Sequence, residues 1–370
     1  MRANMAEPNF MTAILGLALS LALVLTFASL FRFFGRKDLN VHKKHAAHSR
    51  PTSRLGGLAV CLSILTVMVI NNEAWNVEIA ISAFPIFVAG LMEDLGQSIR
   101  PKFRLTVGAF SAGLFVFFEH YYISEVGIEW VNLALSVTPI SIAFTVFCVV
   151  ALINAMNFID GINGLASGKT LMAAFALMWL SNAYNELNLT LLGTAIFSAS
   201  LGLFMLNYPQ GRIFLGDAGA YTLGFLLAVS LITLKSKQPE ISAWSILLII
   251  FWPIADVAHS IFRRWILRQR SDRPDALHLH HVIMRSLVIS SCGRISKQWA
   301  NPLATAIILP MAALPVALGV VYTQSDDLCM ILFLVFALLF ACAHSYITNA
   351  TRRRIFLVRR PKKNSFTETN

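Results

Sequence analysis

The sequence predicts an all-α fold: a polytopic integral membrane helical bundle of about eleven transmembrane helices. Hydrophobic residues make up 56% of the chain and charged residues only 13%, whereas soluble domains carry about 25% charged residues. Apolar runs near the roughly 20-residue crossing length recur from one end of the chain to the other. The expected spans are 10–34, 55–72, 79–95, 103–118, 138–155, 164–181, 188–207, 217–234, 243–266, 302–323 and 328–348.

The basic residues predict how this bundle is oriented. Of the 30 Lys and Arg residues, 27 fall in segments that follow odd-numbered spans, and only 3 lie at the N-terminus or after even-numbered spans. Basic loops stay in the cytoplasm, so we expect a periplasmic N-terminus and a cytoplasmic C-terminus in a bacterial inner membrane. The same rule explains the net charge of +11 without a nucleic-acid partner.

The chain shows no sign of a separate soluble domain. We expect residues 1–350 to form one transmembrane domain and residues 351–370 to form a basic cytoplasmic tail near anionic lipid headgroups. The first apolar run is too long for a signal-peptide core and is interpreted as a retained span. The five cysteines show no paired spacing, which argues against a disulfide framework or a zinc site. The outer loops are short and poor in charge.

The densest polar motif follows the fifth span and occupies residues 154–164. Its amide and carboxylate side chains recur at every third position, so those that continue the helix share one broad face. Such groups beside hydrocarbon are costly unless they face a partner or water, which predicts a binding site. The polar side chains of this motif are Asn154, Asn157, Asp160 and Asn163.

Two further acidic motifs, one of them a pair, lie at span ends on the inner side. Glu93 and Asp94 are adjacent and would repel each other unless a metal or basic side chains neutralise them. Mg²⁺ commonly binds one or two carboxylates together with substrate phosphates. The alternative is an ion pair with Arg100 or Arg104 that only ends the span. Asp217 begins the eighth span between glycines, where a simple helix N-cap explains it almost as well.

Basic and histidine-containing segments complete the inner face. Arg50 lies among hydroxyl residues just before two glycines, a composition that suits an anionic ligand or an ordinary charged loop. His278, His280 and His281 follow an arginine-rich stretch, and no Cys or acidic triad completes a zinc set around them. They fit better as donors to a pyrophosphate or sugar. Asp256 adds a carboxylate inside the ninth span.

Taken together, these motifs resemble the polyprenyl-phosphate N-acetylhexosamine-1-phosphate transferases, glycosyltransferase family 4. The resemblance extends from about residue 50 to residue 285 and is most similar to the branch that initiates O-antigen and enterobacterial common antigen synthesis. It depends on the ordered set 93–94, 154–161, 214–217 and 278–281. It implies that a phosphate oxygen of undecaprenyl phosphate attacks a UDP-N-acetylhexosamine and releases UMP, with Mg²⁺, or Mn²⁺ in its place, as cofactor. A homodimer is also consistent with the family.

The resemblance also implies roles for individual residues. Asp217 and Asp94 are the expected metal ligands, and phosphoryl transfer itself needs mainly positioning and charge neutralisation. Phe214 is expected to stack on uracil. The expected catalytic residues are Glu93, Asp94, Asp160 and Asp217. The expected substrate-binding residues are Asn154, Asn157, Asn163, Phe214, Arg50, Lys102, Asp256, Arg264, His278, His280 and His281.

Two departures and three alternatives qualify this expectation. Many members of the family carry Asp where this chain has Glu93, and Asp where it has Asn163. The alternative within the enzyme class is a phospho-MurNAc-pentapeptide transferase. A membrane transporter would place its polar groups near the bilayer midplane and show repeats, neither of which the sequence indicates. A non-catalytic scaffold would have no need to retain these carboxylates and histidines. The sequence leaves open which N-acetylated sugar is used.

Overall fold

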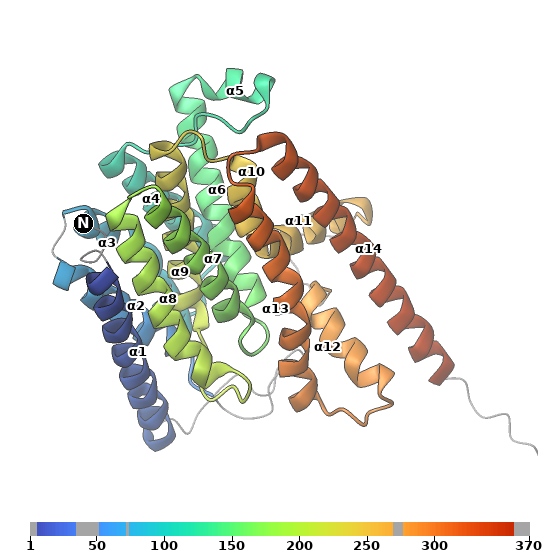
Figure 1. Cartoon of the computed structure of the whole chain (residues 1–370). Helices are drawn as coiled ribbons and strands as arrows, with labels where there is room; N and C mark the ends of the chain where they lie inside the picture. Colours follow the sequence, from blue (N-terminus) through green and yellow to red (C-terminus); the bar gives the residue numbers. More distant parts are fainter. Residues whose placement is uncertain (1–5, 35–51, 72–73, 269–276, 359–370) are drawn as a thin grey trace, which may run out of the picture.

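The computed structural model describes residues 6–34, 52–71, 74–268 and 277–358, and all regular structure in these ranges is helical. The prediction of an all-α chain is therefore confirmed. Figure 1 shows the helices gathered into one bundle. In chain order they are α1 (Ala6–Phe34), α2 (Gly56–Asn71), α3 (Ala74–Asp94), α4 (Pro101–Glu119), α5 (Glu129–Leu135), α6 (Thr138–Ile159), α7 (Leu165–Ala183), α8 (Leu187–Asn207), α9 (Gly216–Lys237), α10 (Ala243–Ile249), α11 (Phe251–Ile266), α12 (Leu279–Ser290), α13 (Lys297–Val321) and α14 (Asp326–Val358).

Each predicted span overlaps a helix, but not every helix is built like a membrane span. Among the described residues, six helices are long and apolar enough to cross a membrane: α1, α6, α8, α9, α13 and α14. The bent pair α10 and α11 makes a seventh if it is one broken span. The other predicted spans correspond to α2, α3, α4 and α7, which are shorter or less apolar. The short helices α5 and α12 were not predicted.

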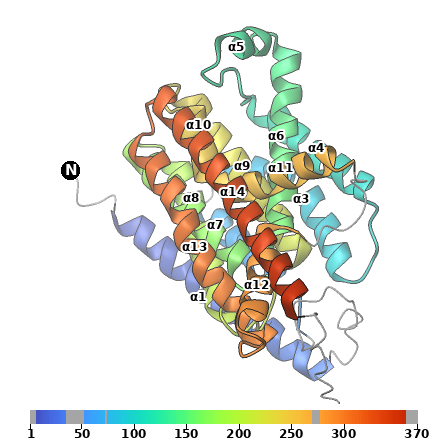
Figure 2. The same cartoon turned by 90° about the vertical axis from the view of Figure 1, so that its right-hand side faces the viewer.

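The helix α9 is the centre of the bundle. Almost every side chain from its start to Leu234 is buried, and α9 packs against α3 and α6 and also contacts α2 and α7. Glycines permit this close packing: a Cβ on Gly57 would lie 2.2 Å from the Gly219 nitrogen, and one on Gly90 would lie 2.5 Å from the Ala218 Cα. Small residues let membrane helices approach closely. By contrast, α1 and α14 lie at the outside of the bundle (Figures 1 and 2).

The ninth predicted span, 243–266, is not one straight helix. The axes of α10 and α11 differ by 87°, and the break lies at Ile250. Pro253 has no amide hydrogen for the carbonyl of Ile249, so the regular helical ladder is interrupted at this point. After the bend, α11 exposes Phe262 and Trp265, the latter to 75%. An exposed tryptophan beside arginines is typical of a membrane–water interface.

Lys169 and the first part of the predicted C-terminal tail both lie within helices. Lys169, which falls in the predicted span 164–181 although the count of basic residues grouped it with the inner segments, lies inside α7 with only 2% of its surface exposed. Its ammonium group is 3.4 Å from the Ala312 carbonyl on α13. The helix α14 extends to Val358, so the first eight residues of the predicted tail continue that helix. The remaining tail residues, from 359, lie outside the described residues.

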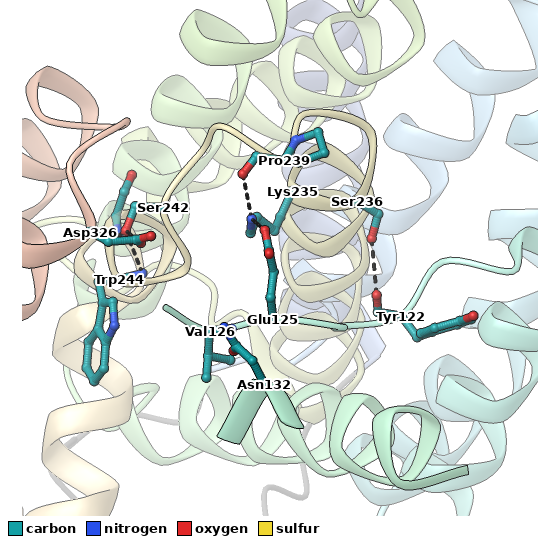
Figure 3. A network of polar contacts seen from close by, with 11 residues as sticks. Tyr122, Glu125, Val126, Asn132, Lys235, Ser236, Pro239, Ser242, Trp244 and Asp326 are labelled. Carbon is teal, nitrogen blue, oxygen red and sulfur yellow. Dashed lines mark hydrogen bonds and ion pairs between the residues drawn. The ribbon is translucent and has the colours of Figure 1, made fainter. Parts of the chain in front are cut away.

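The end of the bundle at the C-terminus of α9 carries more polar contacts than its sequence indicated (Figure 3). Lys235 donates to Glu125 at 2.6 Å and also to the Pro239 carbonyl. The Ser242 hydroxyl caps α10 and donates to Asp326 at the start of α14 at 2.5 Å. These contacts tie the segment before α5 and the starts of α10 and α14 to the end of α9. They stabilise the end of the bundle that lies opposite the carboxylate motifs.

Candidate active site

The N-terminus of α9 is held by a carboxylate from α3. The two oxygens of Asp94 accept hydrogen bonds from the backbone N–H groups of Asp217 at 2.9 Å and Ala218 at 2.8 Å. Gly216 has a φ of +74°, and a Cβ there would lie 2.7 Å from both Asp94 oxygens. Only glycine permits this approach at little cost. A negative charge at a helix N-terminus is also favoured by the helix dipole, so Asp94 fixes where α9 begins.

The side chain of Asp217 points to partners on two other segments. The Asn157 amide donates to Asp217 Oδ1 at 2.5 Å, and Arg54 Nη1 lies 3.7 Å from Asp217 Oδ2. The Asp217 side chain is 23% exposed and the Arg54 side chain is 45% exposed, so both remain partly accessible to solvent. The backbone before α2 pairs with the segment before α9, which places Arg54 beside Asp217: the Gly56 N–H donates to the Phe214 carbonyl at 3.0 Å.

Asp160 joins the same cluster from the end of α6. It follows the last helical residue, and it accepts a hydrogen bond from the Gly216 backbone. Burial raises the pKa of Asp160 well above its ordinary value, and the negative charges of Asp217 and Asp94 raise it further. Three carboxylates from α3, α9 and the end of α6 therefore converge. Such a cluster favours a bound cation or a proton.

Glu93 has a different environment from its neighbour Asp94. The Tyr221 hydroxyl donates to Glu93 Oε2 at 2.5 Å and accepts from Arg104 Nη1 at 3.0 Å. The Arg104 guanidinium also lies over the Tyr221 ring, 5.6 Å from its centroid. Tyr221 is completely buried and stands four residues after Asp217 on α9, so both side chains lie on one helix face. We did not predict Tyr221, and only this four-residue spacing could have indicated it.

The histidine segment is organised around Asp256, a contact that the sequence analysis did not predict. Asp256 Oδ1 accepts from the Leu279 backbone N–H at 3.0 Å, and Asp256 Oδ2 lies 3.2 Å from His278 Nδ1. The His280 Nδ1 atom is 3.3 Å from the same oxygen. Asp256 is 1% exposed and His280 is fully buried. A buried carboxylate with three such partners holds the start of α12 against α11.

The histidines lie directly against the carboxylate motif. A Cβ on Gly161 would lie 2.7 Å from His280 Nε2 and 2.9 Å from His281 Cε1. The His278 ring stacks on Phe158 with a centroid distance of 5.3 Å. Burial lowers the pKa of His281 to about 3, and the positive charges of His280 and His278 contribute to the shift. His281 is therefore neutral near pH 7, and its ring can offer both a donor and an acceptor.

Two predicted asparagines have clear intramolecular partners. Asn154 donates to the Val150 carbonyl of its own helix at 2.7 Å. Asn163 is 6% exposed, its amide donates to the Pro209 carbonyl at 2.9 Å, and its backbone N–H donates to Asn301 on α13. Asn163 therefore ties the turn before α7 to two other segments. The proposed contact of Asn163 with a nucleobase stays a prediction.

The remaining predicted site residues differ in their exposure. Lys102 is exposed in the first turn of α4, and Arg264 is half-buried in the last turn of α11. The Phe214 side chain is half-buried, and its backbone pairs with the segment before α2. Arg50 lies outside the described residues. Uracil stacking by Phe214 and the ligand contacts of the three basic residues stay predictions.

The donor set fits Mg²⁺ bound with help from a substrate. In the described part of the chain, no three His, Cys, Asp or Glu side chains form a ready-made metal cage. Both oxygens of Asp94 already accept backbone hydrogen bonds, whereas Asp217 accepts one hydrogen bond, from Asn157, and is partly exposed. Mg²⁺ usually takes one or two carboxylates, waters and phosphate oxygens rather than an all-protein cage. Asp217 and its neighbour Asp160 could supply such carboxylate oxygens, and metal binding by Asp217 and by Asp94, whose oxygens hold the start of α9, stays a prediction.

Comparison with known proteins identifies the class to which this helical bundle and its carboxylate cluster are similar. A family model described as glycosyl transferase family 4 matches residues 76–235, which include the helices from most of α3 to α9. The predicted resemblance to glycosyltransferase family 4 is therefore confirmed. The match covers Asp94, Asp160 and Asp217 but not the histidine segment.

Individual relatives carry the similarity beyond that range. The chain is 27% identical to the undecaprenyl-phosphate alpha-N-acetylglucosaminyl 1-phosphate transferase of Escherichia coli (strain K12) over 357 residues, 92% of this chain and 93% of the relative. It is 28% identical to a probable undecaprenyl-phosphate N-acetylglucosaminyl 1-phosphate transferase of Bacillus subtilis (strain 168), over 64% of this chain and 67% of the relative. The decaprenyl-phosphate N-acetylglucosaminephosphotransferase of Mycobacterium tuberculosis (strain H37Rv) is 25% identical, over 66% and 68%.

Proposed function

We propose that the protein is a membrane phosphoglycosyl transferase that moves an N-acetylhexosamine-1-phosphate from a UDP-sugar to undecaprenyl phosphate. The observation that carries the proposal is the convergence of Asp94, Asp160 and Asp217 at the start of α9, against the histidine segment. The names of the relatives support the acceptor lipid and make UDP-N-acetylglucosamine the first donor to test. The product would initiate O-antigen or a related cell-envelope polysaccharide.

The reaction requires positioning and charge neutralisation more than covalent help from the protein. A phosphate oxygen of the lipid attacks the sugar-linked phosphorus, a new P–O bond forms, and the bond to the UMP oxygen breaks. The lipid phosphate is largely ionised near pH 7, since a second phosphate pKa is about 6. No strong general base is therefore needed. Arg54 is placed to pair with a phosphate beside Asp217, and His278, His280 and His281 line the side where the pyrophosphate and sugar would lie.

We assign the Mg²⁺ ligands to Asp217 and Asp160. The bound ion would neutralise charge on the phosphate oxygens. Asn157 orients Asp217 by donating to its Oδ1 atom, which leaves the Oδ2 atom near Arg54. Asp94 positions Asp217 by fixing the first turn of α9. Glu93, held by Tyr221 and Arg104, is assigned to the lipid-phosphate side of the site.

We further propose that this end of the bundle faces the cytoplasm of a bacterial inner membrane, where UDP-sugars are made. The basic residues of the loops at this end support the orientation. Cys292 is exposed just after α12 and offers a direct test once the other cysteines are replaced. A membrane-impermeant maleimide should label Cys292 in inside-out vesicles and leave it unlabelled in intact spheroplasts. The reverse pattern would invert the topology.

The activity test uses purified protein, undecaprenyl phosphate, Mg²⁺ and a panel of UDP-N-acetylhexosamines, with UMP and lipid-linked sugar as the measured products. We expect turnover with one donor and its loss on addition of EDTA. Asp217→Asn should reduce turnover about a hundredfold to a thousandfold, the scale of one lost electrostatic element in an active site. Asp326→Asn changes a carboxylate at the opposite end of the bundle and is the matched control. Equal turnover by both variants would remove the metal assignment.

The alternative within the enzyme class, a phospho-MurNAc-pentapeptide transferase, is not favoured by the comparisons. The relatives named above are N-acetylglucosaminyl 1-phosphate or N-acetylglucosamine phosphate transferases. The same assay separates the two activities if UDP-MurNAc-pentapeptide is added to the donor panel. Turnover with that donor alone would replace the proposal, and silence with every donor by folded protein would favour a scaffold.

A further inference from the structure

One histidine far along the chain contacts the histidine segment. His344 lies in α14, a helix at the edge of the bundle with mostly exposed side chains, yet His344 itself is only 3% exposed. Its Nε2 atom is 2.7 Å from the backbone carbonyl oxygen of Leu277. A carbonyl can only accept, so the ring must carry its proton on Nε2 and donate it. Leu277 is the residue directly before His278.

The surroundings of His344 fix its ring. The His259 ring of α11 lies with its centroid 4.2 Å from that of His344, and Phe340 contacts His259 one helical turn earlier in α14. Phe340 also packs edge-on against Trp252 of α11. The His344 ring, which carries the N–H donor, is therefore held in place by the packing of α11 against α14.

Leu277 and the residues after it are consequently held from two sides. Asp256 of α11 accepts from the Leu279 N–H, and His344 of α14 donates to the Leu277 carbonyl two residues earlier. Two opposed main-chain hydrogen bonds fix both the position and the rotation of the peptide units on either side of His278. The direction of the His278 and His280 rings toward Phe158 and Gly161 depends on that rotation.

We propose that His344 is a positioning residue for the donor-binding histidines, acting through the Leu277 carbonyl. The proposal rests on the proposed function, because it takes the histidine segment as part of the donor site. It assigns to α14, which the family model does not cover, a role in the chemistry as well as in membrane anchoring. His344 touches no substrate atom in this account and is not a catalytic residue.

The test compares three variants of the full-length protein in detergent or nanodiscs. His344→Phe keeps a ring in the packed junction and removes the donor, whereas His344→Gln keeps an N–H donor. Phe333→Leu perturbs the packing of α14 against Phe251 of α11, away from the His259 and His344 rings, and is the matched control. For each variant, kcat and KM for UDP-N-acetylglucosamine are measured, together with hydrogen–deuterium exchange of the backbone amides of residues 277–283.

We expect His344→Phe to lower kcat/KM about tenfold, the effect of one lost hydrogen bond of about 1.4 kcal/mol, and to speed exchange in residues 277–283. His344→Gln should restore most of both values, and Phe333→Leu should change neither. Wild-type kinetics and exchange in His344→Phe would overturn the inference, as would an equal loss in Phe333→Leu. Exchange is measured without substrate, so an inactive wild-type protein would refute the proposed function and still leave the His344 contact tested.

Discussion

The hydroxyl of Tyr221 links an acidic and a basic side chain of the site, and its removal gives a sharp test of the geometry. Tyr221→Phe deletes one oxygen from a completely buried ring and leaves the shape of the side chain otherwise unchanged. Two contacts disappear: the donation to Glu93 at 2.5 Å and the acceptance from Arg104 at 3.0 Å. Packing around the ring is expected to stay as it is.

The cost follows from the charges involved. A hydrogen bond to a charged group contributes about 1.5–3 kcal/mol, and Glu93 and Arg104 each lose one. Both can recover part of that loss by pairing with each other or with water, so we expect a net destabilisation of about 2 kcal/mol. At about 2.1 cal/mol/K per residue, the 370-residue chain should show a fall in Tm of about 2–3 °C. The KM for undecaprenyl phosphate should rise because Glu93 loses its fixed orientation.

The assay is a double-mutant cycle on thermal unfolding and on lipid KM. Tyr221→Phe, Glu93→Gln and the double variant are compared with Tyr184→Phe, a control whose hydroxyl accepts only an exposed contact from Gln324. If the hydrogen bond matters, the double variant should cost less than the sum of the two single variants. Strictly additive effects, or an unchanged Tm in Tyr221→Phe, would refute the reasoning.

Contacts elsewhere in the bundle give three further predictions, which concern Asp256, Gly57 and Asp160. Asp256→Asn should lower kcat/KM about a hundredfold with little change in expression, measured on purified protein, because the negative charge is lost and the oxygen beside the two histidines becomes an NH2 donor, while the other oxygen can still accept from the Leu279 N–H; an effect below about threefold would contradict it. Gly57→Ala should destabilise the fold by about 3 kcal/mol or more, seen as lost yield of folded protein, since its Cβ would overlap the Gly219 backbone. Without Mg²⁺, Tm should fall as pH rises above the ordinary Asp160 pKa of 3.8, because the folded state then binds more protons than the unfolded state. Added Mg²⁺ should raise Tm more at pH 8 than at pH 5, because the ionised Asp160 carboxylate binds the ion. A gain in Tm that does not depend on pH would show that Asp160 is not a ligand.

The sequence was most informative about features that depend on neighbouring residues along the chain, such as helix positions and the polar residues at helix ends. The helical class and the position of most long helices follow from apolar runs alone, because a bilayer leaves a chain few ways to satisfy its backbone. The carboxylates Asp94, Asp160 and Asp217 could likewise be selected from sequence, since acidic groups at the ends of apolar helices are costly and need a partner. The family resemblance added their expected roles and was confirmed by the comparisons.

The sequence was less informative about the shape of the ninth span and about Lys169. An apolar run predicts a crossing of membrane thickness, but a bend of 87° at Ile250 depends on how α11 packs afterwards, and Pro253 alone only weakens the ladder there. Lys169 falls inside the predicted span 164–181, but no local pattern indicates what its ammonium group contacts. Its contact with the Ala312 carbonyl depends on the cover that α13 provides.

The sequence by itself therefore determined that the chain folds in a membrane, and it determined which polar residues need partners there. Only the tertiary structure decided which partners they find. Asp94 binds the first amides of α9, Tyr221 bridges Glu93 and Arg104, and His344 reaches Leu277 across 67 positions. Each pair joins segments distant in sequence, and their meeting depends on how the helices pack. No periodicity within one segment encodes that packing, because it is the outcome of small residues and side-chain shapes on several helices at once.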